Sequence, residues 1–260
     1  MVLIFIIDTE ICCCAMTKIR DEKIKNNHNW IPQPFQKSAE AIAQDAVKQY
    51  VKNNQIIGLG SGPMAAAIIR EMGKLSNDIK KTLQCIASST QIKQEALGSN
   101  LRIVDPNQIP QIDVVFDGAD QVDLQLNMIK GGGGALLWEK ILHSAAKTIV
   151  ITAESFKFVN SFDRSVPIEV HPFALYALQN KLESQQGIKP HLRMLNEGYP
   201  YVTENGNFVF DTIFQSIPDV RNKEIELKNT PGVIEVGLFT KKAQVYYKAR
   251  DNGSFETIRS

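Results

Sequence analysis

Acidic, cationic and glycine residues are concentrated in one short passage of the chain, residues 112–140. Two aspartates, Asp117 and Asp120, are followed by Lys130, by four consecutive glycines and then by Glu139. Carboxylates can take up and release protons, an ammonium group can stabilise negative charge, and glycines expose backbone N–H groups to a ligand. Together these groups could move protons next to the carbonyl group of a sugar.

The flanking sequence predicts how this passage is held. Residues 112–116 (IDVVF) are apolar and β-branched, which is typical of a buried parallel strand. Asp117 and Asp120 follow this strand directly, at its carboxyl end, where open α/β sheets bind ligands. The glycines precede a helix predicted at 135–145, and Glu139 lies on that helix.

Each of these residues also has an ordinary structural explanation. Carboxylates that follow a strand commonly cap the next turn, and most glutamates on helices are solvated charges. Asp117 and Asp120 could instead hold Mg²⁺, although no histidine is close to them in sequence. Four glycines lose much backbone entropy on ordering, so the run at 131–134 favours close approach of a ligand over a plain turn.

A second glycine-rich turn, GLGSG at 58–62, follows a short strand predicted at 55–58 and leads into a helix predicted at 63–72. Backbone N–H groups at such helix starts suit phosphate, although a tight strand–helix turn has the same pattern. The turn is not a dinucleotide fingerprint, because Pro63 occupies the place of the third glycine. It is not a Walker loop either, because no Gly-Lys-Ser or Gly-Lys-Thr follows.

Composition and charge exclude several classes of protein. The chain has 260 residues, of which 43% are hydrophobic and 22% charged, as in an ordinary globular protein. Its formal net charge of +1 favours neither nucleic acid nor an anionic membrane. No apolar run reaches the roughly 20 residues of a membrane span. The four cysteines, Cys12, Cys13, Cys14 and Cys85, lack disulfide or zinc-site spacing, so we expect reduced thiols in a cytoplasmic protein.

Strands and helices alternate over the first half of the chain, which predicts an α/β fold with a mostly parallel sheet flanked by helices. Strands predicted at 83–87, 101–104 and 148–152 belong to this pattern. Beyond residue 163 the predicted order is β-α-β-β-α-β, which is typical of a second, smaller ferredoxin-like α+β domain. We place its hairpin at 201–210, with a type I′ turn at Asn205-Gly206.

These elements predict three regions. Residues 1–35 are expected to be a loosely ordered N-terminal extension, in which Met16 is an alternative start. Residues 36–162 and 241–260 are expected to form an α/β catalytic domain. Residues 163–240 are expected to form the small domain.

The chain resembles type A ribose-5-phosphate isomerases from about Ser38 to Ile258. The resemblance rests on GLGSG at 58–62, ASST at 87–90, DGADQVDLQLNMIKGGGGALLWEK at 117–140, TAESFK at 152–157, IEVHPFA at 168–174 and PGVIEVGLF at 231–239. The segment 117–140 is long and is the most specific of these, whereas glycine turns alone would not identify a family.

The resemblance implies reversible interconversion of ribose 5-phosphate and ribulose 5-phosphate, a step of the pentose phosphate pathway, without a metal or other cofactor. It implies Asp117, Asp120, Lys130 and Glu139 as active-site residues. Glu139 would move a proton between C2 and C1, and Lys130 would stabilise the enediolate. Further contacts with the substrate are expected from Lys157 and from a set of serines and glycines: Gly60, Ser61, Gly62, Ser88, Ser89, Gly131, Gly132 and Gly133.

The phosphate end departs from the family pattern. Pro63 and Met64 stand where the family has Ser-Thr, and Glu40 aligns with a lysine of the family. A carboxylate close to a phosphate dianion is repelled by about 1 kcal/mol in solvent. Lys37, three residues before Glu40 and on the same helix face, could replace the missing cation.

This departure leaves the reaction better supported than the substrate. One alternative is an isomerase of another sugar or sugar phosphate, and a second is a non-catalytic sugar-phosphate sensor. A third is a CoA-transferase-like acyl enzyme with Glu139 as its nucleophile. For partners we expect a small sugar phosphate, no nucleic acid, no membrane, and a second copy of the chain in a homodimer or higher homo-oligomer.

Overall fold

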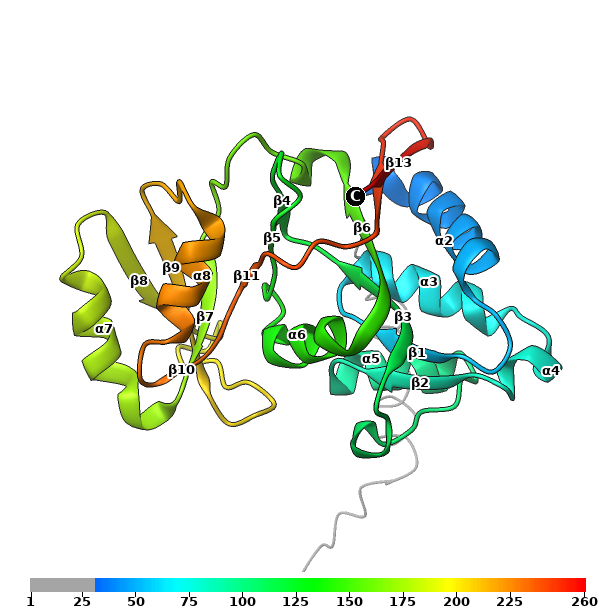
Figure 1. Ribbon diagram of the computed structural model, residues 1–260, viewed down its shortest axis with the longest axis horizontal. Helices are drawn as coiled ribbons and strands as arrows, with labels where there is room; N and C mark the ends of the chain where they lie inside the picture. Colours follow the sequence, from blue (N-terminus) through cyan, green and yellow to red (C-terminus); the bar gives the residue numbers. More distant parts are fainter. Residues whose placement is uncertain (1–30) are drawn as a thin grey trace, which may run out of the picture. The chain divides into compact units, whose positions relative to one another are not determined.

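A computed structural model describes residues 31–260, and Pro34–Ser260 form one compact unit. Cys12, Cys13, Cys14 and Met16 lie outside the described residues, as does most of the predicted extension. The main sheet has six strands in the order β13-β12-β6-β3-β1-β2 (Figure 1). Neighbouring strands are parallel except for the antiparallel pair β12 and β13. The predicted mostly parallel sheet flanked by helices is thus confirmed.

The elements of this α/β part lie close to their predicted positions. The strands are β1 (Ile56–Leu59), β2 (Gln84–Ala87), β3 (Ile112–Gly118), β6 (Ala146–Glu154), β12 (Val245–Ala249) and β13 (Phe255–Arg259). The helices are α2 (Gln36–Tyr50), α3 (Pro63–Gly73), α4 (Asn77–Lys80), α5 (Thr90–Gly98) and α6 (Leu136–Ala145). Strand β3 is buried along most of its length because helices cover both faces of the sheet.

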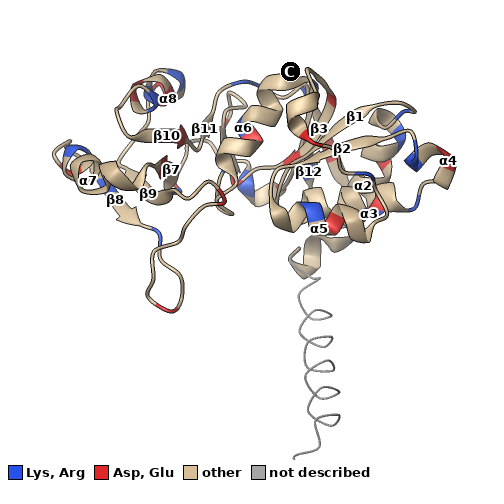
Figure 2. Cartoon of the chain, turned by 90° about the horizontal axis from the view of Figure 1, so that it is seen from below, with Lys and Arg blue, Asp and Glu red and all other residues tan. Residues whose placement is uncertain are grey.

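The direction of the strand order reverses between β1 and β3. The chain passes from β1 through α3 to β2 on one side, and from β3 through α6 to β6 on the other. Right-handed crossovers that run in opposite directions place their helices on opposite faces. Figure 2 shows α6 on one face and α2, α3 and α5 on the other. The carboxyl ends of β1 and β3 therefore form a topological switch point, where α/β sheets bind ligands.

A second sheet of four antiparallel strands has the order β10-β7-β9-β8. Its elements are β7 (Val166–Val170), α7 (Leu175–Glu183), β8 (Ile188–Leu192), β9 (Phe208–Phe214), α8 (Val220–Lys228) and β10 (Val233–Val236). Apolar residues of both helices, such as Leu178 and Leu227, pack on Ile168 and Phe210 of the sheet. The order of elements and the strand order are those of the predicted ferredoxin-like fold.

Several local predictions for the small domain and for residues 101–104 were wrong. The hairpin does not lie at 201–210, because β9 pairs with β8 across a long connection. The turn at Asn205-Gly206 is not type I′, since only Gly206 has a positive φ, of 77°. Strand β8 was not predicted; it lies at the sheet edge, where its Pro190 is tolerated. The strand predicted at 101–104 is reduced to one bridge between Cys85 and Ile103.

A third sheet of very short strands, β11-β5-β4, was not predicted. Strands β4 (Gln121–Val122) and β5 (Met128–Ile129) form a hairpin directly after β3, and β11 (Leu238–Phe239) pairs with β5. Asp120 and Lys130 flank the hairpin, so it returns the chain to the carboxyl end of β3. The domain boundaries at 163 and 240 stay predictions. No helix of the described part is long and apolar enough to cross a membrane.

Candidate active site

Three buried charged side chains meet at the switch point of the main sheet. Asp117 is the penultimate residue of β3, Lys130 follows β5, and Glu139 lies in the first turn of α6. The Nζ of Lys130 lies 3.0 Å from Oδ2 of Asp117 and 3.2 Å from Oε2 of Glu139. Each side chain is at most 3% exposed, so the charges interact with little screening by solvent.

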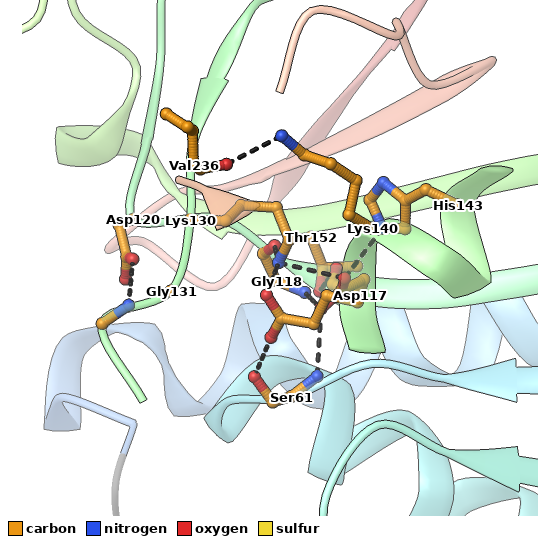
Figure 3. Close-up of polar contacts among 12 residues, drawn as sticks. Ser61, Asp117, Gly118, Asp120, Lys130, Gly131, Lys140, His143, Thr152 and Val236 are labelled. Carbon is orange, nitrogen blue, oxygen red and sulfur yellow. Dashed lines mark hydrogen bonds and ion pairs between the residues drawn. The ribbon is translucent and has the colours of Figure 1, made fainter. Parts of the chain in front are cut away.

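Donors surround both oxygens of the Asp117 carboxylate (Figure 3). Its Oδ1 accepts hydrogen bonds from the backbone N–H groups of Ser61 at 3.0 Å and Gly118 at 2.7 Å. Its Oδ2 lies 2.8 Å from Nε2 of His143, besides the ion pair with Lys130. Burial alone would raise the pKa of Asp117, but Lys130 and His143 hold this pKa below its usual value. Asp117 is therefore an ionised group in one fixed orientation.

Lys130 uses its ammonium group to join three partners. Besides the two carboxylates, its Nζ donates to the backbone carbonyl of Gly118 at 2.7 Å. Burial would lower the pKa of Lys130, but the charges of Asp117 and Glu139 hold it above its usual value. The site therefore contains a permanent cation beside two carboxylates.

Glu139 is the titratable member of the cluster. Its Oε1 accepts a hydrogen bond from the hydroxyl of Ser61, whereas Oε2 faces the Lys130 ammonium at 3.2 Å. Burial raises the pKa of Glu139 to about 7 although the Lys130 ammonium opposes the shift, and the charge of Asp117 adds to it. A carboxylate with a pKa near neutrality is suited to general acid–base catalysis, because it both takes up and releases protons readily.

Asp120 and the glycine run form a second part of the site. The Oδ2 of Asp120 accepts a hydrogen bond from the backbone N–H of Gly132 at 2.8 Å. Gly131 and Gly134 have φ values of 98° and 79°, a backbone region that favours glycine. Gly132 and Gly133 are exposed, so the loop presents backbone to solvent beside the buried cluster.

Side chains from the ferredoxin-like part hold this loop in place. The guanidinium of Arg193 donates to the carbonyls of Gly131 and Gly132, both at 3.1 Å, and forms a bidentate ion pair with Asp211. The hydroxyl of Tyr201 donates to the carbonyl of Gly133 at 3.1 Å. Sequence reasoning missed Arg193 and Tyr201, since nothing in their local sequence marks them.

The predicted serines line a small cavity next to the glycine run. Ser88, Ser89 and Gly133 border this cavity of about 20 Å³. Ser88 follows β2, is 1% exposed, and its hydroxyl has no hydrogen-bond partner among the described residues. Ser89 caps α5 by accepting a hydrogen bond from the N–H of Ile92 at 3.2 Å. The structure thus brings these serines and the glycine run together.

The residues of the predicted phosphate end are dispersed. Gly62 is the N-cap of α3 with φ of 92°, and the side chain of Met64, in the first turn of α3, is buried. Glu40 and Lys37 are exposed on α2. Lys157 lies beyond β6, at the same edge of the sheet as Asp117, but its ammonium forms an ion pair with Glu154 at 2.7 Å. Its contribution to the pocket stays a prediction.

The two aspartates accept hydrogen bonds from different groups of donors. The oxygens of Asp117 accept from Ser61, Gly118, His143 and Lys130, whereas Asp120 accepts from the glycine loop. Among residues 31–260, no group of three or more His, Cys, Asp and Glu residues could hold a metal ion.

Gly60 allows β1 and β3 to approach each other at the site. A Cβ at this position would lie 2.1 Å from Cγ of Asp117, which no side chain tolerates. We expect Gly60→Ala to displace Asp117 and to lower the free energy of unfolding by about 1–3 kcal/mol, as overpacking does. Thermal unfolding measures this effect. Gly98→Ala at the end of α5, where a Cβ meets open space, is the matched control and should not be destabilised.

Comparison with known proteins agrees with this geometry. The chain matches the family model for ribose 5-phosphate isomerase A (phosphoriboisomerase A) over residues 84–253. It is 35% identical over 212 residues to ribose-5-phosphate isomerase A 2 of Yersinia pseudotuberculosis, across 78% of this chain and 89% of the relative.

Two solved structures share the whole fold. A D-ribose-5-phosphate isomerase in complex with phospho-erythronic acid matches with a TM-score of 0.80 and 33% identity, over 87% of this chain and 99% of the other. Ribose 5-phosphate isomerase A of Methanocaldococcus jannaschii matches with a TM-score of 0.78 and 32% identity, over 85% and 98%. The chain described here belongs to the ribose 5-phosphate isomerase A family.

Proposed function

We propose that this chain interconverts ribose 5-phosphate and ribulose 5-phosphate, with Glu139 as the base that moves the proton between C2 and C1. The observation that carries this proposal is the convergence of Asp117, Lys130 and Glu139 in one buried cluster, in a chain of the isomerase family. The Oε2 of Glu139, which faces the Lys130 ammonium in the free protein, is in this proposal the oxygen that accepts the proton.

The charges in the cluster suit an enediolate intermediate. When Glu139 takes the C2 proton it becomes neutral, and the negative charge moves to the oxygen of the substrate. Lys130, which pairs with Glu139 in the free protein, then pairs with that oxygen, so the number of charges in the site does not change. Donors placed in advance at a developing oxyanion are typically worth about 10²–10³-fold in rate. The backbone N–H of Gly133, in the exposed part of the glycine run, supplies a further donor.

Asp117 and Asp120 have different roles in this proposal. Asp117 holds Lys130 in place and is itself saturated with donors, so it acts on the substrate through the lysine. Asp120 is half-buried beside Gly132, and one of its oxygens has no hydrogen bond to residues 31–260, so in this proposal it is the carboxylate that binds sugar hydroxyls.

The substrate end of the proposal rests on the start of α3 and on the relatives. Gly60, Ser61 and Gly62 lead into α3, whose first backbone N–H groups favour a phosphate. One solved relative binds phospho-erythronic acid, which carries a carboxylate as well as a phosphate. A carboxylate resembles the planar, charged enediolate, so this ligand supports both halves of the proposal.

The raised pKa of Glu139 predicts the pH dependence of catalysis. The base must be ionised, so kcat/KM should be constant above about pH 7 and fall about tenfold per unit of pH below it. Initial rates measured at low substrate from about pH 5 to about pH 8 test this expectation. An acid limb centred near pH 4.5, the ordinary value for glutamate, would show that the buried environment does not tune the base.

The direct test is an aldose–ketose isomerisation assay on ribose 5-phosphate with a chelator present, alongside ribose and other aldose phosphates. We expect turnover of ribose 5-phosphate. Turnover of another aldose with none of ribose 5-phosphate would favour the other-sugar isomerase, for which Pro63 and Met64 are the motivation. Binding without turnover would identify a sensor, and a covalent glutamyl adduct would identify an acyl enzyme.

We further propose a cytoplasmic homo-oligomer, a homodimer or larger, acting in the pentose phosphate pathway, with the two domains divided at residues 163 and 240. The match to ribose-5-phosphate isomerases supports the pathway. Phe173 and Tyr176, which are 96% and 78% exposed, supply apolar surface for self-association. Light scattering that reports the mass of a single chain would contradict the oligomer.

A further inference from the structure

His143 is a buried histidine that contacts the charged cluster but that the reaction above does not use. It lies one helical turn after Glu139 on α6, so both side chains project from the same face of the helix. The ring is 1% exposed, and its Nε2 lies 2.8 Å from Oδ2 of Asp117. Figure 3 shows the ring directed at Asp117.

The hydrogen bond assigns the proton on the ring. An ionised carboxylate can only accept, so the Nε2 of His143 carries the hydrogen and donates it to Asp117. The other ring nitrogen, Nδ1, is buried and has no partner among the described residues. Burial holds the pKa of His143 below its usual value. The ring is therefore a neutral donor in one tautomer.

Groups from every neighbouring element surround this ring. Asp117 of β3 and Lys130 after β5 face its Nε2 side, and Glu139 precedes it on α6. Lys241 donates to the backbone carbonyl of His143 at 2.6 Å. The ring of Phe239 packs edge-on at 5.3 Å between ring centres. Among these groups, Asp117 is the one that makes a hydrogen bond with the imidazole ring.

A leucine would fill this space without leaving Nδ1 unpaired. An unpaired buried acceptor costs about 1–3 kcal/mol, so the histidine is unfavourable for stability unless its N–H donor is needed. That donor points at one atom, Oδ2 of Asp117, which is also the oxygen that pairs with Lys130. Without it, Lys130 would be the remaining side-chain partner of that oxygen.

We infer that His143 is a positioning residue of the isomerisation: its Nε2–H fixes the Asp117 carboxylate, and through Asp117 it keeps Lys130 aimed at the substrate oxygen. The inference rests on the proposed isomerase function. It also explains how Asp117 can stay in place when Lys130 turns from Glu139 to the enediolate, because the contact with His143 does not change during the reaction.

The test compares two substitutions that differ in one hydrogen bond. His143→Leu removes the donor and fills the space, whereas the amide nitrogen of His143→Gln reaches the position of Nε2. We expect the leucine variant to lose about 10- to 100-fold in kcat for ribose 5-phosphate, the usual effect of removing a partner that orients an active-site group. Its KM should change little, and the glutamine variant should recover most of kcat.

The pH profile separates positioning from plain packing. Without the Nε2–H of His143, the ionised form of Asp117 is less stable. The pKa at which Asp117 and Glu139 together take up a proton should therefore be higher. The acid limb of kcat/KM should therefore move to higher pH in His143→Leu and return in His143→Gln. If His143→Leu lowers the melting temperature but changes neither kcat nor the acid side of the pH profile of kcat/KM, the inference is overturned.

A measurement without turnover keeps the two proposals distinct. In a ¹⁵N NMR spectrum of the whole protein at neutral pH, His143 should show the Nε2–H tautomer, and Asp117→Asn should change its chemical shift. An Nδ1–H tautomer or a charged ring would overturn the role of His143, whatever the activity. Absence of ribose 5-phosphate turnover by the unmodified protein would refute the isomerase function instead.

Discussion

Glu139→Gln is expected to lower kcat for ribose 5-phosphate by about 10²–10⁴-fold, the usual contribution of a positioned general base. The amide has nearly the same shape and can still accept from Ser61, but it cannot take the C2 proton. Binding of the substrate should persist, because no group that holds the phosphate is changed. Steady-state kinetics and equilibrium binding on the same variant measure both effects. Turnover at the unmodified rate would show that another group is the base.

The stability of this variant reports the same carboxylate independently of kinetics. Glu139 has a raised pKa in the folded protein, so its contribution to stability is present at low pH and is lost as pH rises through about 7. Glutamine does not titrate. The melting temperature of Glu139→Gln relative to the unmodified protein should therefore rise between about pH 5 and about pH 8. Glu197→Gln, at an exposed position, should show no such trend.

Lys130→Met is expected to affect both activity and stability strongly. It removes the cation that stabilises the enediolate, which should cost about 10²–10³-fold in kcat. It also leaves Asp117 and Glu139 as buried carboxylates without their shared cation, and breaking such a pair typically costs about 3–5 kcal/mol. Denaturant unfolding measures the second effect. A stability within about 1 kcal/mol of the unmodified protein would contradict the buried cluster.

The chain offers a matched control for this substitution. Lys147 forms an ion pair with Asp113 at 2.8 Å, but its side chain is 55% exposed, so Lys147→Met should cost less than about 1 kcal/mol. Combining Lys130→Met with Glu139→Gln completes a double-mutant cycle. The double variant should be more stable than the sum of the single effects, because one uncompensated charge has become a neutral amide.

Much of the site could be predicted because its residues lie close together in sequence and at a position that the fold defines. The apolar run before Asp117 indicated a parallel strand, and the carboxyl end of such a strand is where ligands bind. The glycines then had to bring the chain back to a helix. Glu139 and Lys130 were placed near Asp117 by this path and by the resemblance to a family.

The remaining residues of the site could not be predicted, for physical reasons. His143 has the spacing of an apolar helix face, and only the position of Asp117 in space shows that it is a hydrogen-bond donor. Arg193 and Tyr201 reach the glycine loop from more than 60 residues away in sequence. Strand β8 was missed because the Asn205-Gly206 pattern favoured a local partner for β9, whereas the partner in the structure lies across a long connection.

Arg193 and Tyr201, from the connection between β8 and β9, support the glycine loop of the candidate active site. They hold the carbonyls of Gly131, Gly132 and Gly133, so the order of the loop depends on the ferredoxin-like part being folded. A truncated chain that ends at residue 162 would keep Asp117 and Glu139 but lose this support. Loosening of the ferredoxin-like part alone is therefore expected to release the loop and to lower turnover, even where Glu139 stays in place.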